Sequence, residues 1–404
     1  MNVAPFYLPG SYLVLELANG CNLKCRHCAQ ADVSHPHYQE TGYFPRAGVQ
    51  ALLADCARHG IQFDNLVLFW LGEPLLHPEF NAIYEDVLAH TGPSGIFKQV
   101  EVHTNASMLT RQMAARLLNR RAVPQRWHLT LDAADAGTYL EIKGVELLAR
   151  VEENVERLIL WKGRGGFAGP QLVLQYIVSD RNEAEVDAFI ARWKPVFERA
   201  RLPLELTAFH VPHTFEKSYL FFKSLDCPTP EEQARQNTVF QRVVKRLGLS
   251  APLASGDADV HTEQKLEAPV ERLAQRLETP CSGFWKSPVI GWNGMLTTCT
   301  RDSLGENQLG NVLQTPFSTL WFGEGRIARW RQHVGAGDYG DLTLCQSCFI
   351  PRSINYTGIS AGEIAHAAAQ AAIHTHTETL LHPSASPLVS PSEGEGHAPH
   401  ILAV

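Results

Sequence analysis

The stretch Leu15-Glu-Leu-Ala-Asn-Gly-Cys-Asn-Leu-Lys-Cys-Arg-His-Cys-Ala-Gln30 places three cysteines in one short loop, directly after a β-like run. Cys21, Cys25 and Cys28 have the spacing Cys-x-x-x-Cys-x-x-Cys, with which three thiolates can surround one corner of a [4Fe–4S] cubane. A structural zinc site uses four ligands, and a disulfide framework uses an even number of cysteines in a secreted chain. The loop therefore predicts a cluster whose fourth iron is open to a small molecule.

The pattern Cys-x-x-x-Cys-x-aromatic-Cys after a first strand resembles the radical S-adenosylmethionine (radical SAM) superfamily, and His27 stands where the family has an aromatic residue beside the adenine. The resemblance implies that the open iron binds the amino and carboxylate groups of S-adenosylmethionine. In this family the reduced cluster cleaves that cofactor to methionine and a 5′-deoxyadenosyl radical, which takes a hydrogen atom from the substrate. The protein binds and orients the cofactor and the substrate and excludes water, because the cofactor carries the difficult chemistry.

The composition limits the class of protein. The chain has 404 residues, 45% of them hydrophobic, and a net charge of −7, so no basic footprint predicts binding to nucleic acid. Met1–Gly10 lacks the charged start of a signal peptide, and no apolar run approaches about 18 residues, so we expect no membrane span. Seven of the nine cysteines fall in two metal-type groups, which favours a reducing cytoplasm.

Six strand-like runs alternate with helical segments over residues 1–211, which predicts an α/β fold with a parallel sheet, a partial (β/α)6 TIM-like barrel. The runs are Tyr12–Leu17, Asn65–Trp70, Gln99–His103, Arg126–Leu131, Gln171–Val178 and Pro203–Phe209. The helices between them are expected over Val49–His59, ended by Gly60, over Thr138–Trp161 and over Asn182–Arg199. Cys56 lies on the apolar stripe of the first helix and is predicted to be a buried hydrophobe.

Leu71-Gly72-Glu73-Pro74 follows the second strand and resembles the family's Gly-Gly-Glu-Pro motif, with Leu71 in place of the first glycine. The resemblance implies that backbone groups at this strand end, together with Glu73, contact the methionine ammonium of the cofactor. The carboxyl ends of barrel strands are also where active sites lie.

Three further strand ends carry candidate cofactor residues. Asn105 lies in Thr-Asn-Ala, where the family often has Thr-Asn-Gly at the rim of the site. Thr130 and Asp132 resemble the family's Ser/Thr-x-Asp, which usually lies near the carboxylate or the ribose of the cofactor. Gln175, with Ile177, is expected to face the nucleoside from the fifth strand.

A second set of cysteines consists of Cys281, Cys299, Cys345 and Cys348, the last two as Cys-x-x-Cys. An Asn-Gly turn at 293–294 predicts a hairpin that folds Cys299 back toward Cys281. This order resembles the C-terminal auxiliary-cluster domains called SPASM or Twitch. Because no cysteine follows Cys348, residues 281–351 are predicted to hold one auxiliary [4Fe–4S] cluster with four protein ligands; a zinc ion is the alternative.

The remaining segments are less regular. Residues 212–280 are expected to form a connecting helical region, with a helix over Pro228–Leu247. Residues 352–404 are expected to begin with a capping box at Ser360 and Glu363 before an alanine-rich helix, and to continue from about His374 and His376 as a disordered tail.

The two cysteine sets together predict a radical SAM oxidoreductase that passes an electron from the substrate radical to the auxiliary cluster, with flavodoxin or ferredoxin as its reductant. A sugar-like small molecule is the favoured substrate, because a single auxiliary cluster resembles that of oxidoreductases acting on such alcohols. A peptide maturase is the alternative, and the short lead before the first strand, without a leader-binding domain, counts against it. A third possibility is an iron–sulfur carrier, which would not need the Gly-Glu-Pro strand end.

Catalytic residues are left open by the sequence. Cys227 is isolated and is expected to be incidental, although a cysteine there could return a hydrogen atom in an epimerase. His210, His213, Lys217 and Arg301 lie in regions suitable for a general base.

Overall fold

The computed structural model describes residues 6–29, 40–118, 123–212, 215–249, 279–346, 348–349 and 358–381, with only the backbone described for 373–381. His213 and the tail beyond residue 381 therefore lie outside the described residues.

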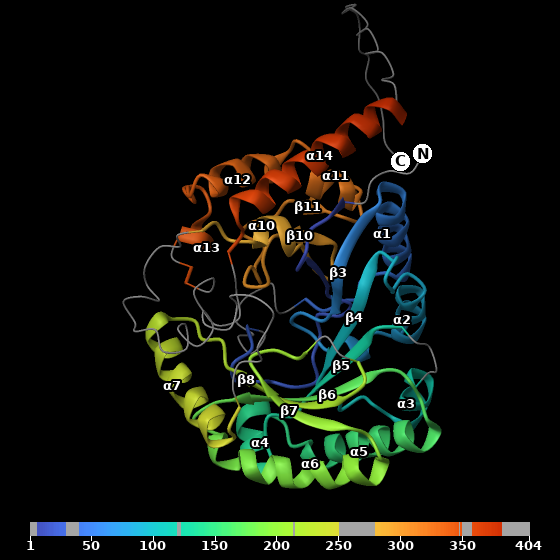
Figure 1. The fold of residues 1–404 in the computed structure, drawn as a ribbon, viewed down its shortest axis with the longest axis vertical. Helices are drawn as coiled ribbons and strands as arrows, with labels where there is room; N and C mark the ends of the chain where they lie inside the picture. Colours follow the sequence, from blue (N-terminus) through green and yellow to red (C-terminus); the bar gives the residue numbers. More distant parts are fainter. Residues whose placement is uncertain are drawn as a thin grey trace, which may run out of the picture.

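A twisted sheet of parallel strands, which does not close on itself, forms the barrel (Figure 1). The central strands are β2 (Tyr12–Leu15), β3 (Ile61–Leu68), β4 (Phe97–Thr104), β5 (Gln125–Thr130) and β6 (Gln171–Val178), and each pairs in parallel with the next. The short β1 (Phe6–Tyr7) pairs with β3. The fold class expected from the sequence, a partial barrel of mixed α/β type, is confirmed.

The sheet continues past β6 in an order that the sequence did not predict. The next strand is β8 (Ser218–Ser224), and β7 (Leu204–Ala208) lies outside it at the edge, both in parallel. The segment expected to be a helical connection thus contributes a strand, and a boundary at residue 211 falls between two strands of one sheet. Ser218–Ser224 is a buried apolar run with three aromatic residues, which suits a strand covered on both faces. The helix expected after it is present as α7 (Pro230–Arg246).

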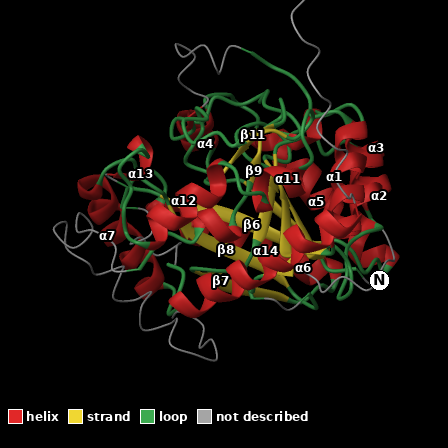
Figure 2. Cartoon of the chain, turned by 90° about the horizontal axis from the view of Figure 1, so that it is seen from above, coloured by secondary structure: helices red, strands yellow, loops and turns green. Residues whose placement is uncertain are grey.

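Helices cover the outer face of the sheet, which Figure 2 shows enclosed by them. Those following the strands are α1 (Arg46–His59), η3 (Pro74–Leu76), α2 (Phe80–Leu88), α3 (Arg111–Leu117), α4 (Ala136–Lys143), α5 (Leu148–Gly165), η4 (Glu183–Glu185) and α6 (Val186–Ala200). Gly60 ends α1 with a φ of 63°, as predicted, and Cys56 is fully buried in the core. The single helix expected over Thr138–Trp161 is instead two, because Gly144 takes a left-handed φ of 72° and ends α4.

The C-terminal part extends the same sheet. The predicted hairpin is present: β9 (Val289–Ile290) and β10 (Met295–Thr297) pair antiparallel around Gly294, whose φ is 87°. The strand β9 pairs in parallel with β2, so the hairpin joins the barrel edge, and β11 (Gly310–Asn311) completes the sheet.

Helices α10 (Gly283–Lys286), α11 (Phe317–Phe322), α12 (Arg326–Gly335), α13 (Thr343–Gln346) and α14 (Ala361–Leu381) gather around this extension. The capping box before α14 is formed, since Glu363 N donates to Ser360 Oγ at 3.3 Å and Ser360 N donates to Glu363 Oε2 at 2.9 Å. The helix also includes His374 and His376, which the sequence placed in a tail. Within the described residues, no helix combines the length and apolarity that a membrane crossing needs.

Candidate functional site

The loop with Cys21, Cys25 and Cys28 is anchored by the end of α4. Lys24 N donates to the carbonyl of Lys143 at 2.9 Å, and Arg26 N donates to that of Ile142 at 2.9 Å. The close fit extends to Gly144, where a Cβ would lie 2.6 Å from the carbonyl oxygen of Lys24. The break between α4 and α5 is therefore what frees backbone carbonyls to hold the cysteine loop.

The three thiols of this loop lie within electrostatic range of one another. All three are partly exposed. Burial raises the pKa of Cys21 to about 12, and the neighbouring Cys25 and Cys28 add to the shift. Three soft sulfur donors on one short loop fit an iron–sulfur cluster and leave one iron without a protein ligand.

Gly72 closes the strand end against the start of the loop. A Cβ at Gly72 would lie 1.9 Å from the carbonyl oxygen of Ala18, so no other residue fits without a shift of the backbone. Glu73 N donates to the carbonyl of Gly20 at 2.9 Å, which fixes the Gly-Glu-Pro segment beside the cysteine loop. The glycine therefore allows the strand end to pack directly on the backbone that leads into the cysteine loop.

The Glu73 side chain is fully buried and accepts hydrogen bonds from the surrounding residues. Its Oε1 accepts hydrogen bonds from Thr104 Oγ1 at 2.6 Å and Leu75 N at 3.0 Å, and its Oε2 accepts one from Asn105 N at 2.8 Å. Burial raises the pKa of Glu73 to about 6, although these hydrogen bonds lower it. The carboxylate thus positions the Thr-Asn-Ala strand end, and its expected contact with the cofactor ammonium stays a prediction.

Asn105 is brought to the cysteine loop. Its Nδ2 donates to Asn22 Oδ1 at 3.0 Å and lies 3.8 Å from Cys21 Sγ. Ala106, at the position where the family often has glycine, adopts a φ of 61°. The residue pair therefore forms the tight turn that the motif implies.

Asp132 is fully buried and faces protein partners. Its Oδ1 accepts a hydrogen bond from Ile177 N at 2.6 Å, and its Oδ2 pairs with Lys143 Nζ at 2.6 Å. Although burial opposes it, the neighbouring Asp132 and Cys25 raise the pKa of Lys143. Asp132 therefore joins β6 to α4 behind the cysteine loop. Its partner Lys143 was not identified from the sequence. A lysine just before the helix-ending Gly144 was the available signal.

The other candidate cofactor residues lie at neighbouring positions. Thr130 and Gln175 are register partners at the ends of β5 and β6, and Gln175 is buried with its Oε1 3.3 Å from His128 Nδ1. His27 is exposed and lines a cavity. Pro74 begins the 3-10 turn after β3.

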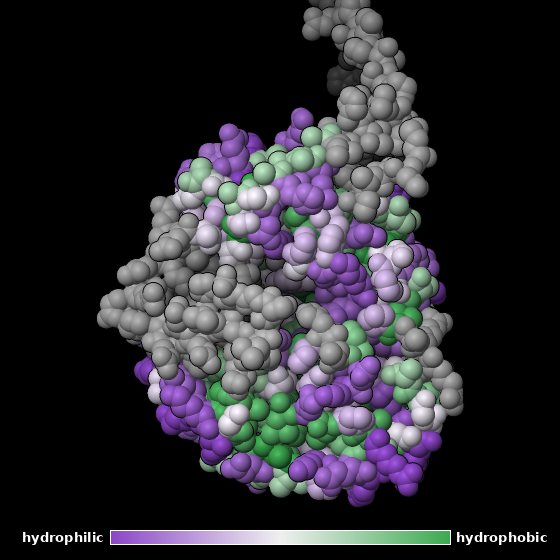
Figure 3. All heavy atoms as spheres, in the orientation of Figure 1, coloured by the Kyte–Doolittle hydropathy of each residue, from purple (hydrophilic) through white to green (hydrophobic). Residues whose placement is uncertain are grey.

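A cavity of about 930 Å³ lies between the barrel and the C-terminal part. Its lining includes His27, Cys28, Leu71, Cys227, Arg301 and Ser303. Figure 3 shows the face of the molecule, mostly hydrophilic and hollowed near its centre. The cavity brings together two residues that the sequence could not assign, one a thiol and one a guanidinium.

Lys217, by contrast, forms an exposed ion pair with Glu205, and His210 follows the edge strand β7. Neither residue is among the described residues that line the cavity.

The second cysteine set converges from separate loops of the C-terminal part. Burial raises the pKa of Cys345 to about 12, with Cys281 and Cys348 adding to the shift, and Cys299 is in range of all three. Asn307 Nδ2 donates to Cys345 Sγ at 3.5 Å, and the backbone N–H of Arg301 donates to Cys299 Sγ at 3.4 Å. Four convergent thiols can complete the coordination of one metal centre.

Glu16 connects the two regions and was not found from the sequence. Its Oε1 accepts a hydrogen bond from Leu71 N at 3.2 Å and its Oε2 accepts one from Trp292 N at 3.1 Å. Burial raises its pKa to about 7. Trp70 Nε1 also donates to the carbonyl of Thr300 at 2.8 Å, so the motif strand end contacts the C-terminal part directly.

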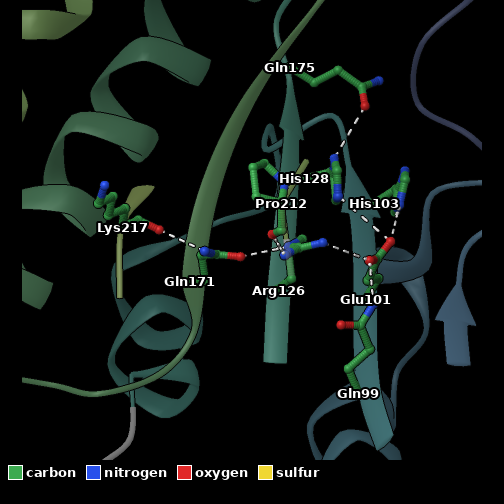
Figure 4. Close-up of polar contacts among 9 residues, drawn as sticks. All are labelled: Gln99, Glu101, His103, Arg126, His128, Gln171, Gln175, Pro212 and Lys217. Carbon is green, nitrogen blue, oxygen red and sulfur yellow. Dashed lines mark hydrogen bonds and ion pairs between the residues drawn. The ribbon is translucent and has the colours of Figure 1, made fainter. Parts of the chain in front are cut away.

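A further polar group, also missed, lies on β4 and β5 (Figure 4). It consists of Glu101, His103, Arg126 and His128, whose alternation with apolar residues in Gln-Val-Glu-Val-His and Arg-Trp-His-Leu-Thr was the signal. The apolar residues between them pack into the core on the helix side, so these polar side chains face the concave side of the sheet.

Comparison with family models places two domains on the chain. Residues 15–159 match the radical SAM superfamily, and residues 281–349 match an iron–sulfur cluster-binding domain. Among curated proteins, the GTP 3′,8-cyclases of Actinobacillus succinogenes and Chlorobaculum tepidum are 24% and 25% identical over 180 and 182 residues, which are 45% and 44% of this chain. The chain spans about half the length of these curated relatives, 49% and 48%.

Two solved structures have a similar fold. SuiB of Streptococcus suis bound to S-adenosylmethionine has a TM-score of 0.52 at 14% identity, covering 89% of this chain and 77% of that one. The protein anSMEcpe with bound AdoMet has a TM-score of 0.53 at 13% identity, covering 92% and 98%.

The matched domains coincide with the two cysteine sets, and the radical SAM domain implies a [4Fe–4S] cluster with S-adenosylmethionine, as the second domain implies auxiliary iron–sulfur. The chain belongs to the radical SAM superfamily and carries a C-terminal iron–sulfur cluster-binding domain of the SPASM type.

Proposed function

We propose that the chain is a cytoplasmic radical SAM oxidoreductase that acts on a hydroxylated small molecule bound between its two cysteine sets. The observation that carries the proposal is the shared cavity, which is lined by Cys28 of the first set and by Arg301, two residues from Cys299 of the second. A substrate in this space would contact Cys28 of the first set and Arg301, which follows Cys299 by two residues.

The ligand roles follow from the donor sets. Cys21, Cys25 and Cys28 hold the cluster with S-adenosylmethionine, and Cys281, Cys299, Cys345 and Cys348 hold the auxiliary [4Fe–4S] cluster. When bound, the first cluster and S-adenosylmethionine supply hydrogen-atom abstraction from carbon, with flavodoxin or ferredoxin as the source of electrons. A zinc ion is the competing occupant of the second set, because four thiolates also suit it.

The chain's own residues orient the cofactor and exclude water. Gly72 lets the strand end pack on the Ala18 carbonyl beside the cysteine loop, and Glu73 holds the Thr-Asn-Ala strand end through Asn105 N. Thr130 and Gln175, paired across β5 and β6, border the nucleoside, with His27 on the cavity side.

A peptide substrate is the second candidate. The structures with a similar fold include SuiB bound to precursor peptide SuiA and anSMEcpe with the Cp18Cys peptide. The molecules bound in those structures are peptides, whereas the substrate proposed here is a hydroxylated small molecule, so a substrate panel separates the two.

Anaerobic reconstitution with iron, sulfide, dithionite and S-adenosylmethionine tests the proposal. We expect 5′-deoxyadenosine to form, and a panel of sugars, aminocyclitols and serine-containing peptides to give a product 2 Da lighter than one small-molecule member. Absence of 5′-deoxyadenosine with every panel member would favour an iron–sulfur carrier.

Cys227 distinguishes oxidation from epimerisation in the same assay. A thiol lining the cavity can return a hydrogen atom, and burial raises its pKa to about 11, which keeps the S–H bond intact at neutral pH. An isomer of the substrate that forms in place of the oxidised product and is 1 Da heavier when the reaction runs in D2O would contradict the oxidoreductase proposal, provided that it is lost in Cys227→Ala but not in Cys56→Ala.

A further inference from the structure

The polar group on the concave face of the barrel is a connected network. Arg126 Nη1 donates to Glu101 Oε1 at 3.2 Å, its Nε donates to Gln171 Oε1 at 2.6 Å, and its Nη2 donates to the carbonyl of Pro212 at 2.6 Å (Figure 4). Gln99 Nε2 donates to the same Glu101 Oε1 at 3.0 Å. One carboxylate oxygen is therefore occupied, and the other, Oε2, faces two histidines.

Those histidines lie close to Oε2, and His103 Nε2 is hydrogen-bonded to it. His103 Nε2 lies 3.4 Å from Glu101 Oε2, and His128 Nε2 lies 3.7 Å from it. Although burial opposes ionisation, the hydrogen bond to His103 and the charge of Arg126 hold the pKa of Glu101 well below its usual range. The carboxylate is therefore ionised, and Arg126 balances its charge.

His128 is left with a buried lone pair. Its Nδ1 lies 3.3 Å from Gln175 Oε1, and in the tautomer in which Nδ1 donates to this oxygen the lone pair is on Nε2. Burial and the neighbouring His103 lower the pKa of His128 well below 6.5, so the ring is neutral and Nε2 is an acceptor. The side chain is 4% exposed, and Nε2 has no hydrogen-bond partner among the described residues. An acceptor buried in this way indicates a ligand that donates.

A metal ion fits this group poorly, although the three ligand atoms of Glu101, His103 and His128 lie within 4.8 Å of one another. An imidazole nitrogen binds a metal in the plane of its ring. The rings of His103 and His128 are stacked, with centroids 4.1 Å apart and an interplanar angle of 17°. One ion cannot lie in both planes, and the Arg126 cation already neutralises the only carboxylate.

The surroundings suit a hydroxylated ring. Phe69, which is 37% exposed, stacks on His103 at 5.3 Å, and Phe221 meets His128 edge-on at 6.1 Å. Apolar ring faces beside a carboxylate and an imidazole acceptor match the alternating C–H and O–H groups of a sugar-like molecule.

The position of this network in the fold also agrees with a ligand-binding site. His103 and His128 lie two residues before the candidate cofactor residues Asn105 and Thr130 on the same strands. Phe69 lies two residues before Leu71, which lines the cavity described above. Glu101, His103 and His128 are not among the residues that line this cavity, so the network lies outside its lining.

We propose that Glu101, His103 and His128 form the binding site for a hydroxyl group of the substrate, with His128 Nε2 as its proton acceptor. The proposal rests on the proposed function and names its missing base. Oxidation of H–C–O–H to C=O releases a hydrogen atom, an electron and a proton. The 5′-deoxyadenosyl radical would take the hydrogen atom, the auxiliary cluster would accept the electron, and His128 takes the proton. The O–H bond breaks, an Nε2–H bond forms, and the Glu101 carboxylate stabilises the imidazolium.

The test compares two substitutions in the reconstituted holoenzyme. His128→Gln keeps a hydrogen-bond acceptor but is not basic, whereas His128→Phe removes the acceptor and keeps an aromatic ring for stacking. His90→Gln is the matched control, because the His90 ring is hydrogen-bonded to the Asp86 carbonyl and lies outside the network. The probes are myo-inositol and a monoaminocyclitol, whose binding is measured by calorimetry.

We expect at least one probe to bind wild-type protein and the His90→Gln control alike. His128→Phe is expected to weaken that binding by about tenfold or more, and His128→Gln by less. For a probe that is also turned over, the ratio of oxidised product to 5′-deoxyadenosine falls by about 10²-fold or more in His128→Gln, the effect of losing a general base.

Several results would overturn the proposal. It is wrong if neither probe binds the wild-type protein, or if His128→Phe binds the probe as well as wild-type protein does. It is also wrong if the wild-type protein holds one divalent ion tightly and His128→Phe loses that ion. Failure of the proposed function gives a different result, since 5′-deoxyadenosine would then be absent from the wild-type protein itself.

Discussion

The two cysteine sets differ in how the fold assembles them. Cys21, Cys25 and Cys28 lie on one loop after β2, held from outside by the backbone at the end of α4. The second set is drawn from loops between residues 281 and 348, and its thiols face one another. Three sulfurs from one loop leave room on the cavity side, whereas four convergent sulfurs enclose their centre. Under the proposed function, this difference means that the first set binds a further ligand, whereas the second set completes the coordination of its own centre.

Their electrostatic surroundings differ as well. The first set lies beside the buried pair of Lys143 and Asp132. The second set has neutral donors, the amide of Asn307 and the backbone N–H of Arg301. A fixed cation near the first set can stabilise the negative charge of a thiolate-ligated cluster, and dipoles do so more weakly.

The largest effect is expected from Cys25→Ala. Removing one of three ligands from the loop should lower the iron content by about four atoms per chain and reduce 5′-deoxyadenosine formation to background. Iron analysis and chromatography of the anaerobic reaction measure both. Cys56→Ala, a core cysteine of α1, is the control. Substantial cleavage activity in Cys25→Ala would erase the distinction between the two sets.

Cys299→Ala separates the functions of the sets. We expect a loss of about four irons, loss of the oxidised product, and 5′-deoxyadenosine formation that stays above about a tenth of the wild-type rate. If zinc rather than iron is lost, the second set is a structural site. Equal loss of cleavage in Cys299→Ala and Cys25→Ala would show that the sets work as one unit.

Lys143→Met tests the anchor of the first set. Leaving Asp132 as an unpaired buried charge should cost about 3–5 kcal/mol of folding stability, measured by thermal or guanidinium unfolding. The first cluster should also be lost on dilution before the second, since only its loop rests on α4. Lys217→Met, which removes an exposed ion pair, should change stability by less than about 1 kcal/mol.

Two amides offer a matched pair of smaller changes. Asn105 Nδ2 points at Cys21 and Asn307 Nδ2 at Cys345. Replacing either by leucine removes a donor to a thiolate, which should lower the reduction potential of that cluster alone by roughly 40 mV, about 1 kcal/mol for one electron. Redox titration followed by electron paramagnetic resonance distinguishes the clusters. A shift of both by one substitution would contradict their independence.

The smallest effect that we expect is a dependence of folding stability on pH, caused by His128 on barrel strand β5. Because the pKa of His128 is lowered in the folded state, the unfolded chain binds a proton more readily below pH 6.5. Stability should therefore fall between pH 6.5 and pH 5, by at most about 1.4 kcal/mol per pH unit from this residue. Melting temperatures of wild-type protein and His128→Phe check this, and equal slopes in both would refute it.

Local spacing explains what could be predicted from the sequence. The cysteine loops, the Gly-Glu-Pro strand end, the Asn-Gly hairpin and the helix end at Gly60 each depend on a few adjacent residues, and each is present as a local structure. The position of β8 between β6 and β7 depends instead on pairing between distant residues, which an apolar run alone does not specify.

The same limit applies to the site. Glu101 and Arg126 meet because β4 and β5 align them as register partners, and Glu16 meets Trp292 because a hairpin from the C-terminal part adds to the sheet. A residue whose partner comes from another strand shows in the sequence only as a polar side chain in an apolar run. The break at Gly144 was visible as a glycine, but its purpose depends on the loop that it contacts.

The parallel pairing of Val14 with Val289 has a consequence for biosynthesis. During translation, the flank of β2 away from β3 emerges from the ribosome with its hydrogen-bonding groups unmatched, and it stays so until the hairpin that covers it has been made. Contacts between such distant residues close slowly. The partly synthesised barrel therefore exposes an unpaired strand edge that can associate with other chains. Metal delivery to the first cysteine loop can begin before the C-terminal hairpin has been synthesised.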